Sequence, residues 1–145
     1  LLAWRHFERT DLAGLDEALQ ALPPAPRVLG LDFVKESAIV EGRPFLQTFA
    51  WAQVLHGGRL NFSFAEFAPS LVVFREERPT PWTHGLEWFA EAVTRADIDG
   101  FPFLLVNATE QTHRRIGALP EATAVTAGLP WRLYRIDPAR VPPPP

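Results

Sequence analysis

The residues best suited to chemistry in this sequence form one short run, His56-Gly57-Gly58-Arg59, between two aromatic segments. An imidazole, two glycines and a guanidinium could supply a general base, backbone amides that hold an anion, and a cation that pairs with a phosphate or carboxylate. Phosphate cradles normally precede a helix, whereas here a helical pattern ends at the glycines. Because a helix C-terminus presents carbonyl oxygens, this order favours a structural corner that turns an aromatic helix back into a sheet.

Residue types that bind metals or attack substrates are poorly arranged elsewhere. The four histidines show no His-x-x-x-His or His-Glu-x-x-His spacing, so we predict no metal site and no cofactor. Cysteine is absent, and no serine lies in a Gly-x-Ser-x-Gly elbow. The acidic pairs Asp97/Asp99 and Glu76/Glu77 suit a turn and a charged surface cluster. We therefore predict no catalytic residue in this chain.

Tryptophan offers a second route to ligand binding. A flat indole beside Asp, Asn or Arg can stack on a sugar ring, and Trp51, Trp82 and Trp88 could act in this way. Trp88 lies off the apolar stripe of its predicted helix and is expected to be partly exposed. Core packing is the alternative for each tryptophan, because an indole buries up to about 250 Å². The predicted ligand-facing residues are His56, Gly57, Gly58, Arg59 and Trp88.

Composition limits the class of protein. The 145 residues suffice for one domain, which we place at 1–141 before a proline tail at 142–145. Hydrophobic residues make up 47% of the chain, which favours a folded core over disorder. The formal net charge of −3 at pH 7 provides no broad basic field, so we predict no nucleic-acid partner.

The start of the chain, Leu1-Leu2-Ala3-Trp4, has no methionine, and we expect a processed product or a piece of a longer protein. No run approaches the roughly 20 apolar residues that span a bilayer. If the parent is a membrane protein, its spans are expected outside these residues.

Apolar periodicity predicts strands interleaved with helices, and hence an α/β fold with a central mixed sheet flanked by helices. Asp11 is expected to cap the first helix, and Asn107 to begin the last. The predicted helices are 12–22, 45–55, 82–95 and 109–118. The predicted strands are 27–33, 60–64, 71–76 and 101–108, followed by a C-terminal hairpin whose second strand is 131–136.

Several short segments carry a family resemblance over roughly residues 26–137. They are "PRVLGLDF" (26–33), the double glycine, "FSFAEF" (62–67), "LVVFRE" (71–76), "FPFLLVNA" (101–108) and "GLPWRLYRID" (128–137). Their order is similar to that in the soluble extracytoplasmic C-terminal domain of bacterial polytopic membrane proteins resembling polyprenol-dependent glycosyltransferases.

The resemblance implies a non-catalytic accessory or recognition domain on the periplasmic or cell-surface side of a bacterial membrane. Its implied partners are a glycan or lipid-linked sugar, and the membrane through upstream segments. In such transferases the catalytic acid usually lies in a loop between early membrane spans, so no catalytic residue carries over to this chain. The alternative is a free-standing small-molecule enzyme that uses His56 and Arg59, with His113 as a further candidate.

Overall fold

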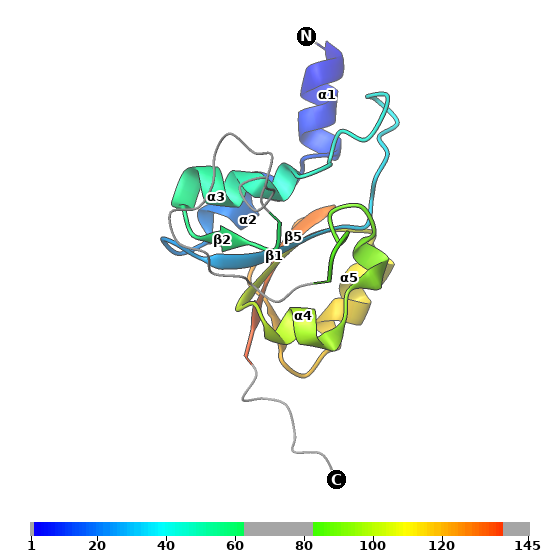
Figure 1. The fold of residues 1–145 in the computed structure, drawn as a ribbon. Helices are drawn as coiled ribbons and strands as arrows, with labels where there is room; N and C mark the ends of the chain where they lie inside the picture. The colour runs from blue at the N-terminus through cyan, green and yellow to red at the C-terminus, as the bar shows by residue number, and fades with distance from the viewer. Residues whose placement is uncertain (1, 63–82, 138–145) are drawn as a thin grey trace, which may run out of the picture.

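One mixed β-sheet organises the part of the chain that the structure describes, with the strand order β2-β1-β3-β5-β4 (Figure 1). The computed structural model describes residues 2–62 and 83–137. β1 is parallel to β2 and β3, whereas β5 is antiparallel to β3 and β4. The strands are β1 (Arg27–Asp32), β2 (Arg59–Leu60), β3 (Phe103–Asn107), β4 (Ala122–Ala124) and β5 (Trp131–Ile136). The predicted α/β class with a central mixed sheet and a C-terminal hairpin is confirmed.

Helical segments cover both faces of this sheet (Figure 1). One face carries α1 (Leu2–Thr10), α2 (Leu15–Gln20), the 3-10 helix η1 (Thr48–Ala50) and α3 (Trp51–His56). The other face carries the 3-10 helix η3 (Ala90–Ala92), α4 (Arg95–Asp99) and α5 (Glu110–Gly117). Two separate apolar clusters therefore lie on opposite faces of the sheet. No helix in the described ranges is long and apolar enough to cross a membrane.

β1 is the central element because apolar side chains cover it on both sides. Val28 belongs to the cluster beneath α2 and α3, whereas Leu29 and Leu31 belong to the opposite cluster. Gly30 leaves room for the ring of Phe49, which a Cβ at this position would overlap. The helical segment 48–56 can therefore pack directly onto the strand.

Asn61 extends the pairing between β2 and β1 through its side chain. Its Oδ1 accepts a hydrogen bond from the Gly30 N–H at 2.8 Å, and its Nδ2 lies 3.5 Å from the Gly30 carbonyl oxygen. The predicted alternation at 60–64 put Asn61 on the polar side, but Asn61, Leu60 and Phe62 are all buried. The amide replaces a backbone partner, which explains how a polar side chain fits there. Residues 63 and 64 of that predicted strand lie outside the described ranges.

The predicted start of the helix at 12–22 is wrong, because α2 begins at Leu15. The Asp11 N–H donates to the Phe7 carbonyl oxygen at 2.8 Å, so Asp11 closes α1 rather than opening α2. Its carboxylate accepts a hydrogen bond from the Ser37 hydroxyl. The shorter α2 still buries Leu15 and Leu19, as the apolar spacing predicted.

The predicted helix at 45–55 is only partly formed. It begins as turns and η1 and becomes α-helical at Trp51. Phe45, Phe49 and Ala52 are buried as expected, but Leu55 is exposed. α3 ends at His56, immediately before the double glycine, as predicted.

The predicted helix at 82–95 is wrong across residues 83–94, because turns and η3 occupy them. Gly85 has φ +87, a left-handed conformation that interrupts a right-handed helix. Thr94 then begins α4 through a capping box with Asp97, so Asp97 and Asp99 lie in a helix rather than in the predicted turn. Residue 82, the predicted strand 71–76 and the tail 142–145 lie outside the described ranges.

The predicted order of helices and strands after residue 100 is confirmed, but a different residue caps α5. β3, α5 and the β4–β5 hairpin lie close to their predicted ranges. Thr109, rather than Asn107, caps α5 and accepts from the Thr112 N–H. Asn107 instead ends β3.

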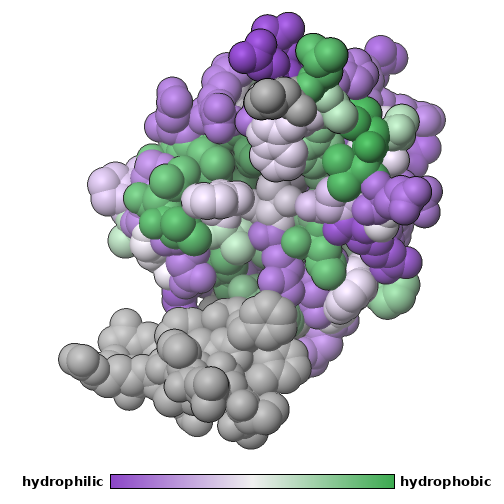
Figure 2. Space-filling model, turned by 90° about the horizontal axis from the view of Figure 1, so that it is seen from above, coloured by the Kyte–Doolittle hydropathy of each residue, from purple (hydrophilic) through white to green (hydrophobic). Residues whose placement is uncertain are grey.

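Apolar side chains also remain exposed on α1 and α3. The view from above in Figure 2 shows green apolar areas divided by purple hydrophilic ones. Scattered exposed apolar residues are usual on folded proteins and do not by themselves mark a partner surface. The exposed ones on these two helices are Leu2, Trp4, Trp51, Val54 and Leu55.

Replacing Asn61 with Ala tests the side-chain extension of β2. The Gly30 N–H would lose its partner in a buried position, so we expect the free energy of unfolding to fall by about 1–3 kcal/mol. Urea denaturation measures the change. The control is Gln111→Ala, which removes an exposed amide from α5 and should shift stability by less than about 0.5 kcal/mol. Equal effects of the two substitutions would contradict the bridging role of Asn61.

Candidate functional site

The predicted corner at 56–59 joins α3 to β2 at the amino end of the sheet. Arg59 pairs in register with Arg27, the first residue of β1. The Ala25 N–H donates to the His56 carbonyl oxygen at 2.8 Å, and the Arg59 N–H donates to the Pro26 carbonyl oxygen at 2.8 Å. The corner is therefore tied by backbone hydrogen bonds to the segment that leads into β1.

Two amides of the corner are engaged within the fold. The Gly57 N–H donates to the Gln53 carbonyl oxygen at 2.8 Å, and the Arg59 N–H is used as described above. Gly58 passes so close to residues 25 and 26 that a Cβ would overlap the Pro26 carbonyl oxygen. The glycines thus allow a close backbone approach, and these two amides are not directed at a bound anion.

The opposite, carboxyl end of the sheet brings together Asp32 and Asn107. Asp32 ends β1 and Asn107 ends β3, and the two are partners in the parallel register. Asp32 is only 4% exposed, and Asn107 is fully buried. Among the described residues, neither Asp32 carboxyl oxygen nor Asn107 Oδ1 has a hydrogen-bond partner, whereas Asn107 Nδ2 donates to the Val34 carbonyl oxygen at 3.2 Å.

The strand order explains why this end is open. The chain leaves β1 toward β2 on one side, and it leaves β3 toward β5 and β4 on the other. Loops that diverge in this way create a crevice at the carboxyl ends of two neighbouring parallel strands. Open α/β sheets commonly bind their ligands at such a switch in direction.

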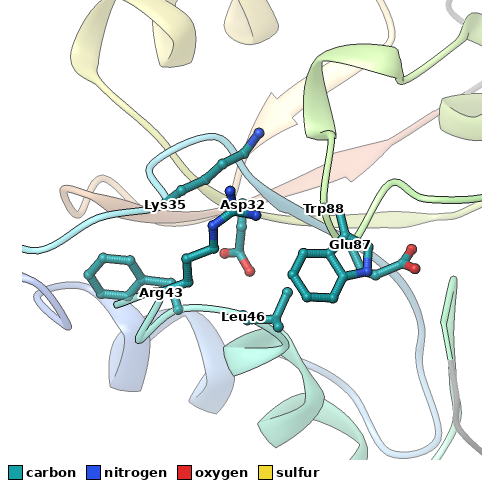
Figure 3. A pocket seen from close by; sticks show the side chains of 7 residues that line it. Asp32, Lys35, Arg43, Leu46, Glu87 and Trp88 are labelled. Atoms are coloured by element: carbon teal, nitrogen blue, oxygen red, sulfur yellow. The ribbon is translucent and has the colours of Figure 1, made fainter. Parts of the chain in front are cut away.

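A hollow at the carboxyl end of β1 is lined by side chains from three segments of the chain (Figure 3). Its enclosed space is only about 10 Å³, room for about one water molecule or hydroxyl group, and the rest of the hollow is open to solvent. A ring would therefore lie at the open rim, with one of its hydroxyl groups reaching the enclosed part. The lining residues are Asp32, Lys35, Arg43, Phe45, Leu46, Glu87 and Trp88.

The hollow contains one of the predicted ligand-facing residues, Trp88, which is 41% exposed. The other four, residues 56–59, lie at the amino end of β1. The six residues of β1 make five steps of about 3.3 Å, so its two ends lie about 16 Å apart. The structure therefore does not bring the predicted set together at one site.

Two cations border the hollow beside aromatic rings. The Arg43 guanidinium lies 5.7 Å from the centroid of the Trp88 ring, and the Lys35 ammonium lies 5.3 Å from that of Phe89. Lys35 also forms an ion pair with Glu91 at 3.1 Å. Neither cation forms an ion pair with Asp32, although all three side chains line the same hollow. Arg43 forms no ion pair with any residue in the described ranges.

Burial controls the protonation of Asp32. It raises the pKa of the carboxyl to about 8, and the side chain of Asn107 opposes this rise only in part. The reason is that a buried carboxylate loses its hydration, while the nearby groups supply too few donors to replace it. Asp32 is therefore largely protonated at neutral pH, when its carboxyl group has one O–H donor and one free carbonyl oxygen.

His113, a candidate of the enzyme hypothesis, lies in a separate buried network. Its Nε2–H donates to the Pro130 carbonyl oxygen at 2.8 Å, and Nδ1 lies 3.0 Å from the Tyr134 hydroxyl. Burial lowers the pKa of the imidazole. His113 packs on β5, and β1 and β3 lie between that strand and β2. His113 therefore joins α5 to β5 and does not meet His56 or Arg59.

Within residues 2–62 and 83–137, no group of three or more His, Cys, Asp or Glu residues is arranged to hold a metal ion. Comparisons with protein-family models, curated proteins and solved structures found no match to this chain.

The sequence patterns did not single out Asp32, Arg43 or Asn107 as site residues. One available signal was the acidic residue at the end of the apolar run "RVLGLD", because an aspartate at the carboxyl end of a buried parallel strand often faces a ligand. Arg43 offered no comparable signal, because it lies in an irregular loop far from Trp88 in sequence.

Replacing each corner glycine with Ala tests the close approach at Gly58. Both glycines have positive φ, so both substitutions introduce backbone strain of about 1–3 kcal/mol. Gly58→Ala also forces a Cβ against the Pro26 backbone, whereas the Cβ in Gly57→Ala meets open space. We expect Gly58→Ala to lower the free energy of unfolding by about 1–3 kcal/mol more than Gly57→Ala. Equal losses in urea denaturation would refute the close approach.

Replacing Asp32 with Asn tests the burial of its carboxyl group. The folded-state pKa of about 8 exceeds the ordinary value of 3.8, so the native protein retains a proton that the unfolded chain releases between these pH values. Native stability should fall as pH rises through this window, by at most about 1.4 kcal/mol per pH unit from this group.

The amide introduced by Asp32→Asn cannot titrate, so the stability of this variant relative to the native protein should increase from pH 5 to pH 7. Urea denaturation at both pH values measures the difference. Asp16→Asn removes an exposed carboxylate from α2 and is the control. A difference independent of pH would show that Asp32 is not buried as described.

Proposed function

We propose that this chain is a non-catalytic recognition domain that binds a glycan in the hollow between Asp32 and Trp88. The observation that carries the proposal is an exposed indole beside buried polar atoms that lack partners among the described residues. A sugar ring has an apolar face of C–H groups that can lie on an indole, and hydroxyl groups at its edge. In the hollow, the indole of Trp88 is the counterpart of the apolar face, and the carboxyl group of Asp32 is the counterpart of the hydroxyl groups.

The polar floor of the hollow matches hydroxyl groups in particular. A largely protonated Asp32 offers one donor and one acceptor, neither of which has a partner among the described residues. A sugar hydroxyl both donates and accepts, so it can satisfy either atom of the carboxyl group. Because a buried polar atom without a partner costs about 1–3 kcal/mol, satisfying these atoms favours binding.

The size of the hollow supports recognition of a single ring rather than enclosure of a long chain. The enclosed part, about 10 Å³, admits about one hydroxyl group, so a monosaccharide unit would lie at the open rim against Trp88. Neighbouring units of a longer glycan would extend into solvent. This geometry suits the end of a glycan or one residue within it.

The raised pKa of Asp32 favours one second candidate function, namely proton transfer to a bound sugar oxygen. Glycoside hydrolysis usually requires a pair of carboxyl groups that flank the scissile bond. Glu87 lines the same hollow, but in Figure 3 its carboxylate is directed away from Asp32. Binding without catalysis is therefore the better-supported function.

The sequence resemblance supports a wider context for this domain. In that context, the domain belongs to the extracytoplasmic side of a bacterial membrane protein of glycosyltransferase type. It recognises a glycan or lipid-linked sugar that the membrane-embedded part handles. Apolar spans encoded upstream of Leu1 in the parent gene would agree with this context, and a cytoplasmic parent without spans would exclude it.

Substitution of Trp88, with an exposed tryptophan outside the hollow as control, tests glycan binding in this hollow. A glycan array followed by calorimetry on the bound compounds should give a measurable affinity for the native protein. Trp88→Ala should weaken it by at least about tenfold, because the stacking surface is lost. Trp51→Ala is the matched control, since Trp51 is 53% exposed on α3 and does not line the hollow. The proposal fails if no glycan binds, or if both substitutions weaken binding equally.

A further inference from the structure

We infer that the ligand of this hollow is an anionic saccharide, in which a hydroxylated ring carries a carboxylate or phosphate group. This inference rests on the proposed function and narrows its ligand class. It depends on the placement of Arg43 and Lys35 rather than on the polar floor. The shared chemistry of the two anions is an oxyanion attached to a sugar ring.

The cationic groups gather on one side of the hollow. Figure 3 shows the Arg43 guanidinium and the Lys35 ammonium on the same side of the Asp32 carboxyl group. The two side chains come from the irregular segment between β1 and η1, which has no helix or strand between residues 33 and 47. A loop that returns two cations to the carboxyl end of its own strand produces a local positive rim.

The two cations differ in how their charge is balanced. Lys35 has Glu91 as its partner at 3.1 Å. Arg43 has no carboxylate within ion-pair distance among the described residues, although Asp32 and Glu87 line the same hollow. A guanidinium has five N–H donors in a planar fork that matches the two oxygens of a carboxylate or phosphate. Arg43 is thus the group best suited to receive an anion from the ligand.

Trp88 links the ring and the anion into one ligand. Its indole lies 5.7 Å from the Arg43 guanidinium, and the same exposed indole provides the stacking surface for a sugar. A guanidinium held beside an aromatic ring keeps its orientation and can still donate from its edge. An oxyanion bound there would therefore lie next to the ring that stacks on Trp88, as a substituent of that ring.

The acidic residues around the hollow are compatible with an anion. Asp32 is largely protonated near neutral pH, because burial raises its pKa to about 8. Glu91 is paired with Lys35, and the Glu87 carboxylate is directed away from Asp32 (Figure 3). Asp32 therefore adds little negative charge. Glu87 also forms no ion pair among the described residues, so an anion would bind on the Arg43 side of the hollow, away from the Glu87 carboxylate.

Calorimetry with the native protein compares glucose, glucuronate and glucose 1-phosphate as probes. We expect at least one of the two charged compounds to bind at least about tenfold more tightly than glucose, since charge-assisted hydrogen bonds are stronger than neutral ones. The tighter of the two identifies the anion. Raising NaCl from about 50 to about 500 mM should reduce this preference, because salt screens charges at an open rim.

Two substitutions of Arg43 test whether this residue causes the preference for charged compounds. Arg43→Gln should bring the ratio of charged to neutral affinity close to one, and Arg43→Lys should give an intermediate ratio because the fork is lost while the charge remains. Arg5→Gln, on an exposed position of α1, should leave the ratio unchanged. Thermal melting shows whether each variant is folded. Equal ratios in Arg43→Gln and Arg5→Gln would overturn the inference.

The failure of this inference can be distinguished from the failure of the proposed function. If glucose binds as tightly as both charged compounds, the inference is wrong while glycan binding stands. If none of the three probes binds and the glycan array is also negative, the proposed function is wrong as well.

Inorganic phosphate and acetate are tested as anions that carry no sugar ring. If either binds as tightly as its sugar counterpart, the rim is a simple anion site and the saccharide assignment is overturned.

Discussion

Burial of a carboxyl group at the end of β1 is the constraint on which the rest of the site depends. β1 lies between β2 and β3, and apolar clusters cover both of its faces. The strand nevertheless ends in Asp32, whose oxygens have no partner among the described residues. In such surroundings the charged form is disfavoured, which is why the pKa of this carboxyl group rises to about 8. The parallel register then places Asn107, a second buried residue with an unpartnered oxygen, beside Asp32.

The two ends of β1 differ because backbone hydrogen bonds close one end, whereas diverging loops leave the other end open. At the amino end, the corner at 56–59 is closed by hydrogen bonds from Ala25 and to Pro26, and Gly58 allows the backbones to touch. At the carboxyl end, the chain leaves β1 and β3 in opposite directions, so the two loops diverge. The amino end is therefore closed, whereas at the carboxyl end Asp32 lines a hollow, the kind of position where open α/β sheets commonly bind ligands.

Local patterns were sufficient for the elements that bury continuous apolar runs. The ranges of β1 and β3 and the terminal hairpin followed from such runs, and the end of α3 followed from its double glycine. Features that depend on distant partners were not predictable in this way. Asn61 is buried because it bonds to Gly30, 31 residues away in sequence, and a period-two pattern carries no information about that partner. Arg43 lies beside Trp88 only in the folded protein, so the sequence carried no signal of its place at the hollow.

The error at 82–95 and the exposure of Phe89 have the same physical cause. A continuous helix would have followed the stripe of Leu86, Phe89 and Ala90 toward the core. The left-handed conformation of Gly85 interrupts it, so Leu86 and Ala90 remain buried while Phe89 is exposed. Trp88 beside it is exposed as its place off the stripe predicted. The freed aromatic rings then lie beside Lys35 and Arg43, with which they form cation–π contacts. The departure from helical periodicity is therefore what creates an aromatic and cationic rim over the buried polar floor.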